Sequence, residues 1–79
     1  MKFEWDKNKN QQNIHKHGIS FEEATEIFDG VVFTSIDEQY DYEEIREISI
    51  GSIQGLVIIT VAHTGRNGKI RLISAQKAP

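Results

Sequence analysis

Residues 56–75, LVIITVAHTGRNGKIRLISA, set the architecture of this chain. Asn67-Gly68 is a strong signal for a two-residue hairpin turn, and apolar or β-branched runs flank it on both sides. Because strand side chains alternate between two faces, one face of the first strand should carry Val57, Ile59, Val61 and His63. In the second strand, Ile70, Leu72 and Ser74 alternate with Arg71, Ile73 and Ala75. The segment therefore predicts an antiparallel hairpin whose first strand is central in a sheet.

Two helices are predicted ahead of the hairpin, each with its own start signal. Asp6 is a suitable N-cap for a polar helix that ends near Lys16. Gly18 can then adopt the positive φ angle of a helix end. Ser20 and Glu23 form a capping box for a second helix. That helix carries an apolar stripe at helical spacing, formed by Phe21, Ala24, Ile27 and Phe28.

Three more strands complete the predicted sheet, at residues 2–5, 31–36 and 45–51, with an acidic loop between the last two. The element order is therefore β-α-α-β-β-β-β. Because sequential strands with short connections usually pair, we predict an α+β fold of two layers, an antiparallel β-sheet meander with two helices packed on one face. The length of 79 residues suits a single domain, which we assign to residues 1–79.

The composition excludes several classes of protein. Cysteine is absent, which removes disulfide staples, thiolate catalysis and cysteine zinc sites. No apolar run reaches the length of about eighteen residues that a membrane span needs, and the first residues lack the apolar core of a secretory signal. With 38% hydrophobic and 27% charged residues, the chain is typical of a folded soluble protein, and we expect it in the cytoplasm.

The charges are strongly segregated along the chain. Residues 21–47 carry ten acidic side chains and one basic one, whereas residues 48–79 carry four basic side chains and no acidic one. These four are Arg66, Lys69, Arg71 and Lys77. A local cationic surface of this kind steers polyanions even though the net charge of the chain is −3. The alternative is that the basic strands simply pair with an acidic neighbour, and charge alone does not choose between the two.

His63 is the first candidate for chemistry, because Arg66 lies in the adjoining turn and pairing across the hairpin should bring Arg71 near Thr64 and His63. An imidazole beside guanidinium groups suits RNA cleavage without a metal ion. A base removes the proton of the 2′-hydroxyl, an acid protonates the leaving 5′-oxygen, and arginines stabilise the charged phosphorane. The alternative is that His63 is structural and that the arginines only keep an exposed strand soluble.

His17 is the second candidate, at the end of the first helix beside Lys16. The alternative is that both side chains are cationic partners of the helix dipole. His15 and His17 do not share a helical face, so they make a poor metal site. The acidic residues show none of the spacings of metal-binding motifs, and we expect no metal site.

Several local strings occur together in an order typical of one protein family. They are Phe3-Glu4-Trp5-Asp6, Lys16-His17-Gly18, Ser20-Phe21-Glu22-Glu23-Ala24 and Arg71-Leu72-Ile73-Ser74-Ala75. Over almost its whole length the chain resembles the BrnT family of type II toxins. The resemblance implies a RelE-like fold and a small ribonuclease that cleaves RNA and inhibits translation. It implies no cofactor, because RelE-like cleavage uses the 2′-hydroxyl of the RNA itself.

The resemblance also implies partners and site residues. A BrnA antitoxin with a ribbon-helix-helix DNA-binding part would neutralise the toxin, so the chain would reach DNA only through that complex, and no membrane is involved. The residues expected in catalysis are His17, His63, Arg66 and Arg71. The residues expected to bind RNA are Lys16, Lys69 and Lys77.

Two features depart from the family pattern. The family usually continues beyond the last strand into a basic C-terminal helix, so the chain looks short at its C-terminus, and Gln76 stands where an arginine is common. These departures keep two alternatives open. One is a degenerate toxin homologue that binds the antitoxin without cleaving RNA, and the other is a plain RNA-binding module.

Overall fold

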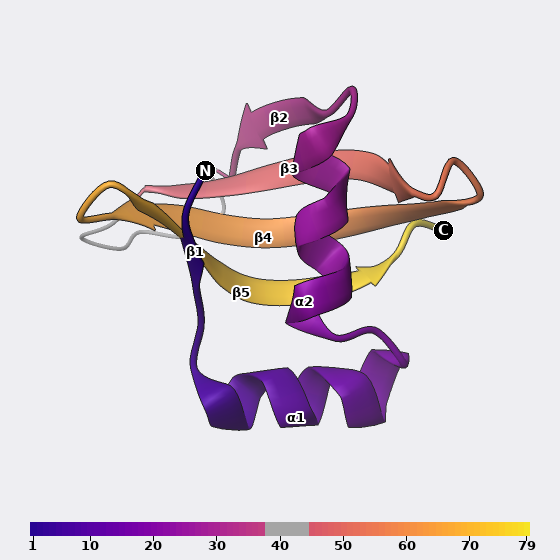
Figure 1. Ribbon diagram of the computed structural model, residues 1–79, viewed down its shortest axis with the longest axis horizontal. Coiled ribbons are helices and arrows are strands. Elements are labelled where there is room, and N and C mark those ends of the chain that lie inside the picture. Colours follow the sequence, from indigo (N-terminus) through magenta and orange to yellow (C-terminus); the bar gives the residue numbers. More distant parts are fainter. Residues whose placement is uncertain (38–44) are drawn as a thin grey trace.

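The computed structural model describes residues 1–37 and 45–79, and the predicted acidic loop lies mostly outside the described residues. Its elements are β1 (Phe3–Glu4), α1 (Lys7–His17), α2 (Phe21–Ala24), the 3-10 helix η1 (Thr25–Asp29), β2 (Phe33–Ile36), β3 (Arg46–Ile53), β4 (Val57–Arg66) and β5 (Lys69–Lys77). Figure 1 shows one twisted sheet crossed on one side by α2 and η1, with α1 beyond one edge. The predicted α+β class and element order are confirmed.

The strand order in the sheet is β1-β5-β4-β3-β2. The strands from β2 to β5 pair antiparallel, and Asn67 and Gly68 both take positive φ angles at the predicted hairpin turn. β1 adds a parallel pair to the predicted meander, because Phe3 is opposite Ile70 of β5. The first strand thus lies beside the last, which brings α1 next to β5.

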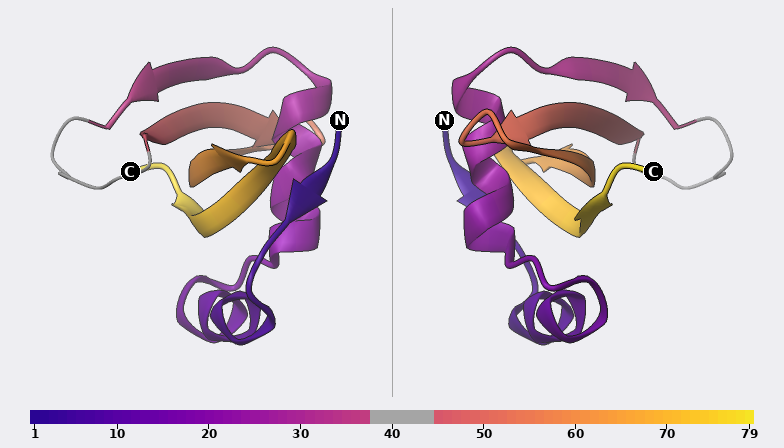
Figure 2. Two further views of the ribbon diagram at one scale, coloured as in Figure 1. Left: turned by 90° about the vertical axis from the view of Figure 1, so that its left-hand side faces the viewer. Right: turned by 90° about the vertical axis from the view of Figure 1, so that its right-hand side faces the viewer.

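One face of the sheet, which we call the helix face, is covered by α2 and η1 (Figure 2). Ser20 starts α2 with the predicted capping box. Phe21, Ala24 and Ile27 are buried, as their spacing predicts. They pack on four buried side chains of β4 and β5, namely Ile59, Val61, Leu72 and Ala75. Over the opposite face, which we call the open face, the described residues place no helix (Figure 2).

α1 is attached to the fold by two buried asparagines and not by an apolar stripe. Asn10 and Asn13 are 5% and 6% exposed, whereas Ile14 of the same helix is 39% exposed. Nδ2 of Asn10 donates to Oε1 of Glu22 at 2.8 Å, and Oδ1 of Asn10 accepts a hydrogen bond from the backbone N–H of Phe21 at 2.8 Å. These two bonds fix α1 against the start of α2.

Asn13 fastens the same helix to the edge of β5. Its Nδ2 donates to the carbonyl oxygen of Ala75 at 2.8 Å, and its Oδ1 accepts from the N–H of Ala75 at 3.1 Å. The side-chain amide therefore takes the place of a neighbouring strand, since β1 pairs with β5 only as far as Arg71. Nδ2 also donates to the carbonyl oxygen of Ile19 at 2.9 Å, which holds the connection between α1 and α2.

β5 contains an irregularity that simple alternation does not predict. Relative to β4 it carries one extra residue, Ile73, which forms a β-bulge. The bulge shifts the alternation, so Leu72 and Ala75 both face the helices and are both buried. The predicted grouping of Ser74 with Leu72 on one face is therefore wrong, and Ser74 lies on the open face.

Replacing Asn13 by alanine should lower the free energy of unfolding by about 2–4 kcal/mol, because the buried polar groups of Ala75 and Ile19 would lose their partner. Urea unfolding followed by circular dichroism measures the change. Gln11→Ala is the matched control, since Gln11 is exposed on the same helix, and its effect should stay within about 0.5 kcal/mol. Equal stabilities of the two variants would contradict the role assigned to Asn13.

Candidate functional site

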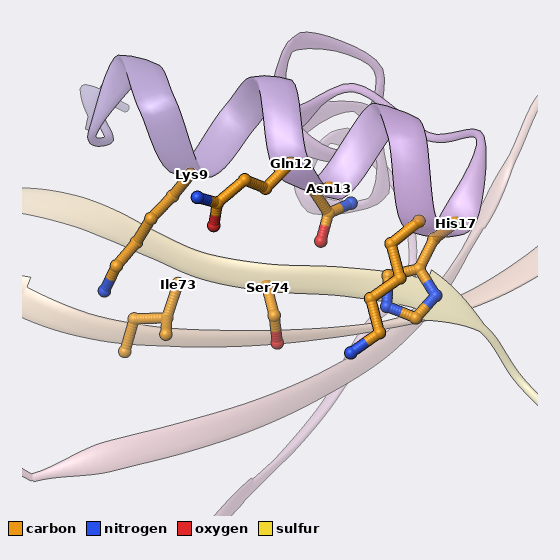
Figure 3. A pocket seen from close by; sticks show the side chains of 7 residues that line it. Lys9, Gln12, Asn13, His17, Ile73 and Ser74 are labelled. Atoms are coloured by element: carbon orange, nitrogen blue, oxygen red, sulfur yellow. The ribbon is translucent and has the colours of Figure 1, made fainter.

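A cleft of about 220 Å³ lies between α1 and β5 at the margin of the open face (Figure 3). Its lining residues are Lys9, Gln12, Asn13, Lys16, His17, Ile73 and Ser74. Figure 3 shows Lys9, Gln12 and His17 extending from one side of the helix toward β5, where Ile73 and Ser74 lie. The cleft thus gathers ammonium, imidazole, amide and hydroxyl groups around one hollow.

Helical spacing explains why these side chains converge. The five helix residues of the cleft recur at intervals of three and four positions and so share one face of α1. Asn13, in the middle of the set, is bonded to β5, and this contact turns the whole face toward the strand. Lys9 and Lys16 lie on either side of it, about 10 Å apart along the helix axis. Among the described residues, no acidic side chain lines the cleft, so its charge is positive along its length.

A row of paired residues crosses the open face on four strands. Thr64 of β4 pairs with Arg46 of β3 on one side and with Arg71 of β5 on the other. Arg71 in turn pairs with Glu4 of β1. The position of Arg71 across from Thr64 is the one predicted from the hairpin. Nη1 of Arg71 donates to Oε2 of Glu4 at 2.6 Å, and both side chains are partly exposed. The row lies on the open face because the neighbouring Leu72 is buried beneath the helices.

Arg71 is close to the start of α1, and His17 ends the same helix. The Asp6 carboxylate accepts hydrogen bonds from the backbone N–H groups of Lys9 and Asn8 at 3.1 and 2.8 Å. These bonds lower the pKa of Asp6, and the positive charge of Arg71 adds to the same shift. Arg71 and His17 therefore mark the two ends of one polar surface, which we call the α1–β5 seam. Its members are Lys9, Lys16, His17, Arg71 and Ser74.

The structure separates His63 from Arg71, the pair on which the predicted hairpin chemistry depends. His63 projects to the helix face and is 5% exposed, whereas Arg71 projects to the open face. Nε2 of His63 is 2.6 Å from Oγ of Ser49, and its ring meets the Phe28 ring edge-on with centroids 5.3 Å apart. Burial lowers the pKa of His63, and the carboxylate of Glu47 opposes that shift. His63 is thus a neutral core residue that a ligand on the open face does not reach.

The other predicted residues are spread along the sheet. Arg66 and Lys69 are exposed and lie opposite each other at the tip of the hairpin. Lys77 is exposed near the far end of β5, about 26 Å along the strand from Lys69. Of the predicted set, the structure brings Lys16 and His17 together in the cleft. The catalytic and RNA-binding roles of all these residues stay predictions.

Comparison with known proteins identifies the family of the chain. A family model described as the ribonuclease toxin BrnT of type II toxin–antitoxin systems matches residues 5–79. This chain belongs to the BrnT family. The family resemblance inferred from the motifs is therefore confirmed, and the BrnT family is one of ribonuclease toxins of type II toxin–antitoxin systems.

A solved structure shows the same fold. The 1.1 Å crystal structure of the Brucella abortus ribonuclease toxin BrnT matches this BrnT-family chain with a TM-score of 0.76 at 31% sequence identity. The alignment covers 100% of this chain and 97% of the Brucella chain. A search of curated proteins finds no match.

Five cleft residues of this BrnT-family chain are missing from the set predicted from sequence, and Lys9, Gln12 and Ser74 are three of them. The two helix residues do carry a signal, because their spacing from His17 places them on one face of α1. Ser74 carries none, since only the bulge turns it into the cleft. Within residues 1–37 and 45–79, no group of three or more histidine, aspartate or glutamate side chains could hold a metal ion. In the same residues, none of the helices has the length and apolar character of a membrane span.

The buried imidazole predicts a stability that depends on pH. The pKa of His63 is lower in the folded state than in the unfolded chain, where it is about 6.5. At a pH between these two pKa values, the unfolded chain therefore binds more protons than the folded one. The contribution of His63 to stability is therefore complete above about pH 6.5. It is lost as the pH falls toward the folded-state pKa, by at most about 1.4 kcal/mol for each pH unit. Urea unfolding between about pH 7.5 and pH 5.5 measures this loss.

Two variants isolate the His63 contribution from that of other groups. His63→Gln should be less stable at neutral pH and should lose this part of the pH dependence. His15→Gln, at an exposed position of α1, should keep it. The assignment fails if the His63 variant shows the pH dependence of the wild type.

Proposed function

We propose that this chain is a metal-independent endoribonuclease toxin, a single domain over residues 1–79, whose RNA substrate binds along the α1–β5 seam. The observation that supports this proposal is the convergence of Lys9, Lys16 and His17 on one cleft. Of the three histidines in the sequence, His17 is the one that lines it. Positive charge beside a group that transfers protons suits a polyanion with a reactive hydroxyl.

RNA supplies its own nucleophile, so the chain has to move protons and bind phosphate charge. The 2′-oxygen attacks the phosphorus, the bond to the 5′-oxygen breaks, and a 2′,3′-cyclic phosphate forms. His17 accepts the proton of the 2′-hydroxyl or donates one to the leaving 5′-oxygen, and water serves as the partner in the other proton transfer. Lys9 and Lys16 bind flanking phosphates. Arg71, oriented by its ion pair with Glu4, stabilises phosphate charge at the other end of the seam.

The proposed partner of this toxin is a BrnA-like antitoxin with a ribbon-helix-helix part, and both proteins act in the cytoplasm. Membership in a type II toxin–antitoxin family supports a protein antitoxin. The toxin reaches DNA only through that complex. An antitoxin segment that covers the α1–β5 seam would neutralise the toxin by excluding RNA.

A second candidate function is antitoxin binding without cleavage. The observation that favours it is the separation of His63 from Arg71, because the histidine–arginine pair of the hairpin does not form. A chain with this function would associate with the antitoxin and leave RNA intact. A plain RNA-binding module would retain RNA in a salt-sensitive way without cutting it.

His17→Gln should lower the rate of RNA cleavage by about 100-fold or more, because proton transfer by a positioned side chain contributes on that order. The measurement is the initial rate on a labelled single-stranded RNA. His15→Gln is the matched control and should cleave at the wild-type rate, since His15 lies outside the cleft. Wild-type cleavage by the His17 variant would rule out its role. No cleavage by the wild type would select the second candidate function.

A double variant, Lys9→Gln with Lys16→Gln, should weaken RNA binding and its dependence on salt. Each lost phosphate contact lowers the slope of log K against log salt by about 0.7 for a single strand, so the pair should lower it by about 1.4. Fluorescence anisotropy with a labelled RNA measures the slope. Lys7→Gln is the control, because Lys7 is exposed on α1 outside the cleft. A slope equal to that of the wild type would mean that RNA binds elsewhere.

A further inference from the structure

We propose that two copies of this chain associate through the outer edge of β2, in a continuous antiparallel sheet whose two-fold axis passes beside Thr34. The proposal does not depend on the ribonuclease function. β2 ends the strand order of the sheet. Figure 1 shows it as the outermost strand, with no described element beyond it.

β2 lacks the features that usually protect an edge strand. Residues 30–36, GVVFTSI, contain no charged residue and no proline, which are the residues that oppose edge pairing. All of β2 is exposed, and Val31, Phe33 and Ile36 expose 80%, 74% and 61% of their surface. The opposite edge differs, because β1 there consists of only two residues and Asn13 occupies the edge of β5 beyond it. The outer edge of β2 is therefore the place where this sheet can accept another strand.

The pairing of β2 with β3 determines which backbone groups point outward. The N–H of Asp37 donates to the carbonyl oxygen of Arg46 at 2.9 Å. In an antiparallel ladder the residues that bond to one neighbour alternate, so the odd-numbered residues of this segment bond to β3. The N–H and C=O groups of Thr34 and Ile36 then point to the outer edge. The distance of 2.7 Å between Oγ1 of Thr34 and Oγ of Ser49 agrees, since side chains approach closely in the non-hydrogen-bonded pairs.

A second copy fits this edge in one register. With the axis beside Thr34, the N–H of each Thr34 donates to the carbonyl oxygen of Thr34 in the other copy. Val32 of one copy then pairs with Ile36 of the other, and Phe33 lies opposite Ser35. Because the axis is perpendicular to the sheet, both copies keep their helices on the same side.

The symmetry of the segment selects a second copy over an unrelated strand. Val32 and Ile36 are equally far from Thr34 along the chain, so the antiparallel arrangement brings two apolar side chains together on each side of the axis. No charge lies within residues 30–36, and two copies therefore meet there without repulsion. One pair of short strands buries little surface, so we expect a weak dimer.

The dimer keeps both α1–β5 seams accessible, because each lies at the edge of its sheet away from β2. With strands about 4.8 Å apart, four spacings on each side separate the two seams by about 40 Å. Self-association and RNA binding therefore use different surfaces, and a failure of one proposal does not affect the other.

Cysteine cross-linking tests the register. The chain contains no cysteine, so one introduced thiol reports one contact. In Thr34→Cys the two Cα atoms would be about 5.5 Å apart, within the range of a disulfide, and mild oxidation should give a covalent dimer. In Ser35→Cys the two copies of the residue are offset by two positions, at about 8 Å, and should not cross-link. Equal cross-linking of the two variants, or none with Thr34→Cys, would overturn the proposal.

Sedimentation equilibrium tests the association itself. Ile36→Lys brings a charge opposite Val32 of the other copy and should weaken the dimer by about tenfold or more. Leu56→Lys is the control, because Leu56 is 82% exposed at the turn between β3 and β4, and the dimer should keep its wild-type dissociation constant. Circular dichroism verifies that both variants fold. The proposal fails if the wild type remains a monomer at high concentration, or if both lysine variants dissociate alike.

Discussion

The pairing of the Asn13 amide with the backbone of Ala75 is the interaction on which the α1–β5 seam depends. α1 has too few apolar side chains to be held by the hydrophobic effect, and its one isoleucine is largely outside the core. A buried amide without partners would destabilise the fold, whereas one that meets a strand edge satisfies its own groups and those of the strand. One residue thus closes a sheet edge, orients a helix and turns a row of cationic side chains toward β5.

The histidines show how burial decides between structural and chemical roles. His63 belongs to a chain of hydroxyl and imidazole groups that runs from the exposed Thr34 through the buried Ser49. Its surroundings bury the imidazole, and this burial favours the neutral form by lowering its pKa. His17, at the end of α1, lines the cleft together with Lys9 and Lys16. The same side-chain type therefore belongs to the core in one place and lines an open cleft in another.

Much of the fold could be predicted because its signals are local. The Asp6 cap, the capping box at Ser20 and the Asn67-Gly68 turn each specify a structure within a few residues. Alternation also placed His63 on the face of Ile59 and Val61, but it could not say that this face lies under a helix. Which face is covered is decided by the packing of η1 on the sheet, and this contact is not encoded locally.

The candidate site was less predictable because it depends on contacts distant in sequence. The pairing of β1 with β5 brings α1 to the edge of β5. The local sequence of neither strand indicates that the two strands pair. The bulge at Ile73 reverses the faces of the residues that follow, which moves Ser74 into the cleft and Ala75 into the core. Lys9 does carry a signal in the sequence, because its helical spacing to His17 places both residues on one face of α1.

The long loop closed by Asn13 and Ala75 has a consequence for the synthesis of the chain. These residues are 62 positions apart, so α1 reaches the ribosome exit well before its docking strand. Until β5 has been made, the basic face of α1 lacks the strand against which its side chains are arranged. The cleft is therefore completed only after β5 has been synthesised and has met α1, so its two sides come together at a late step.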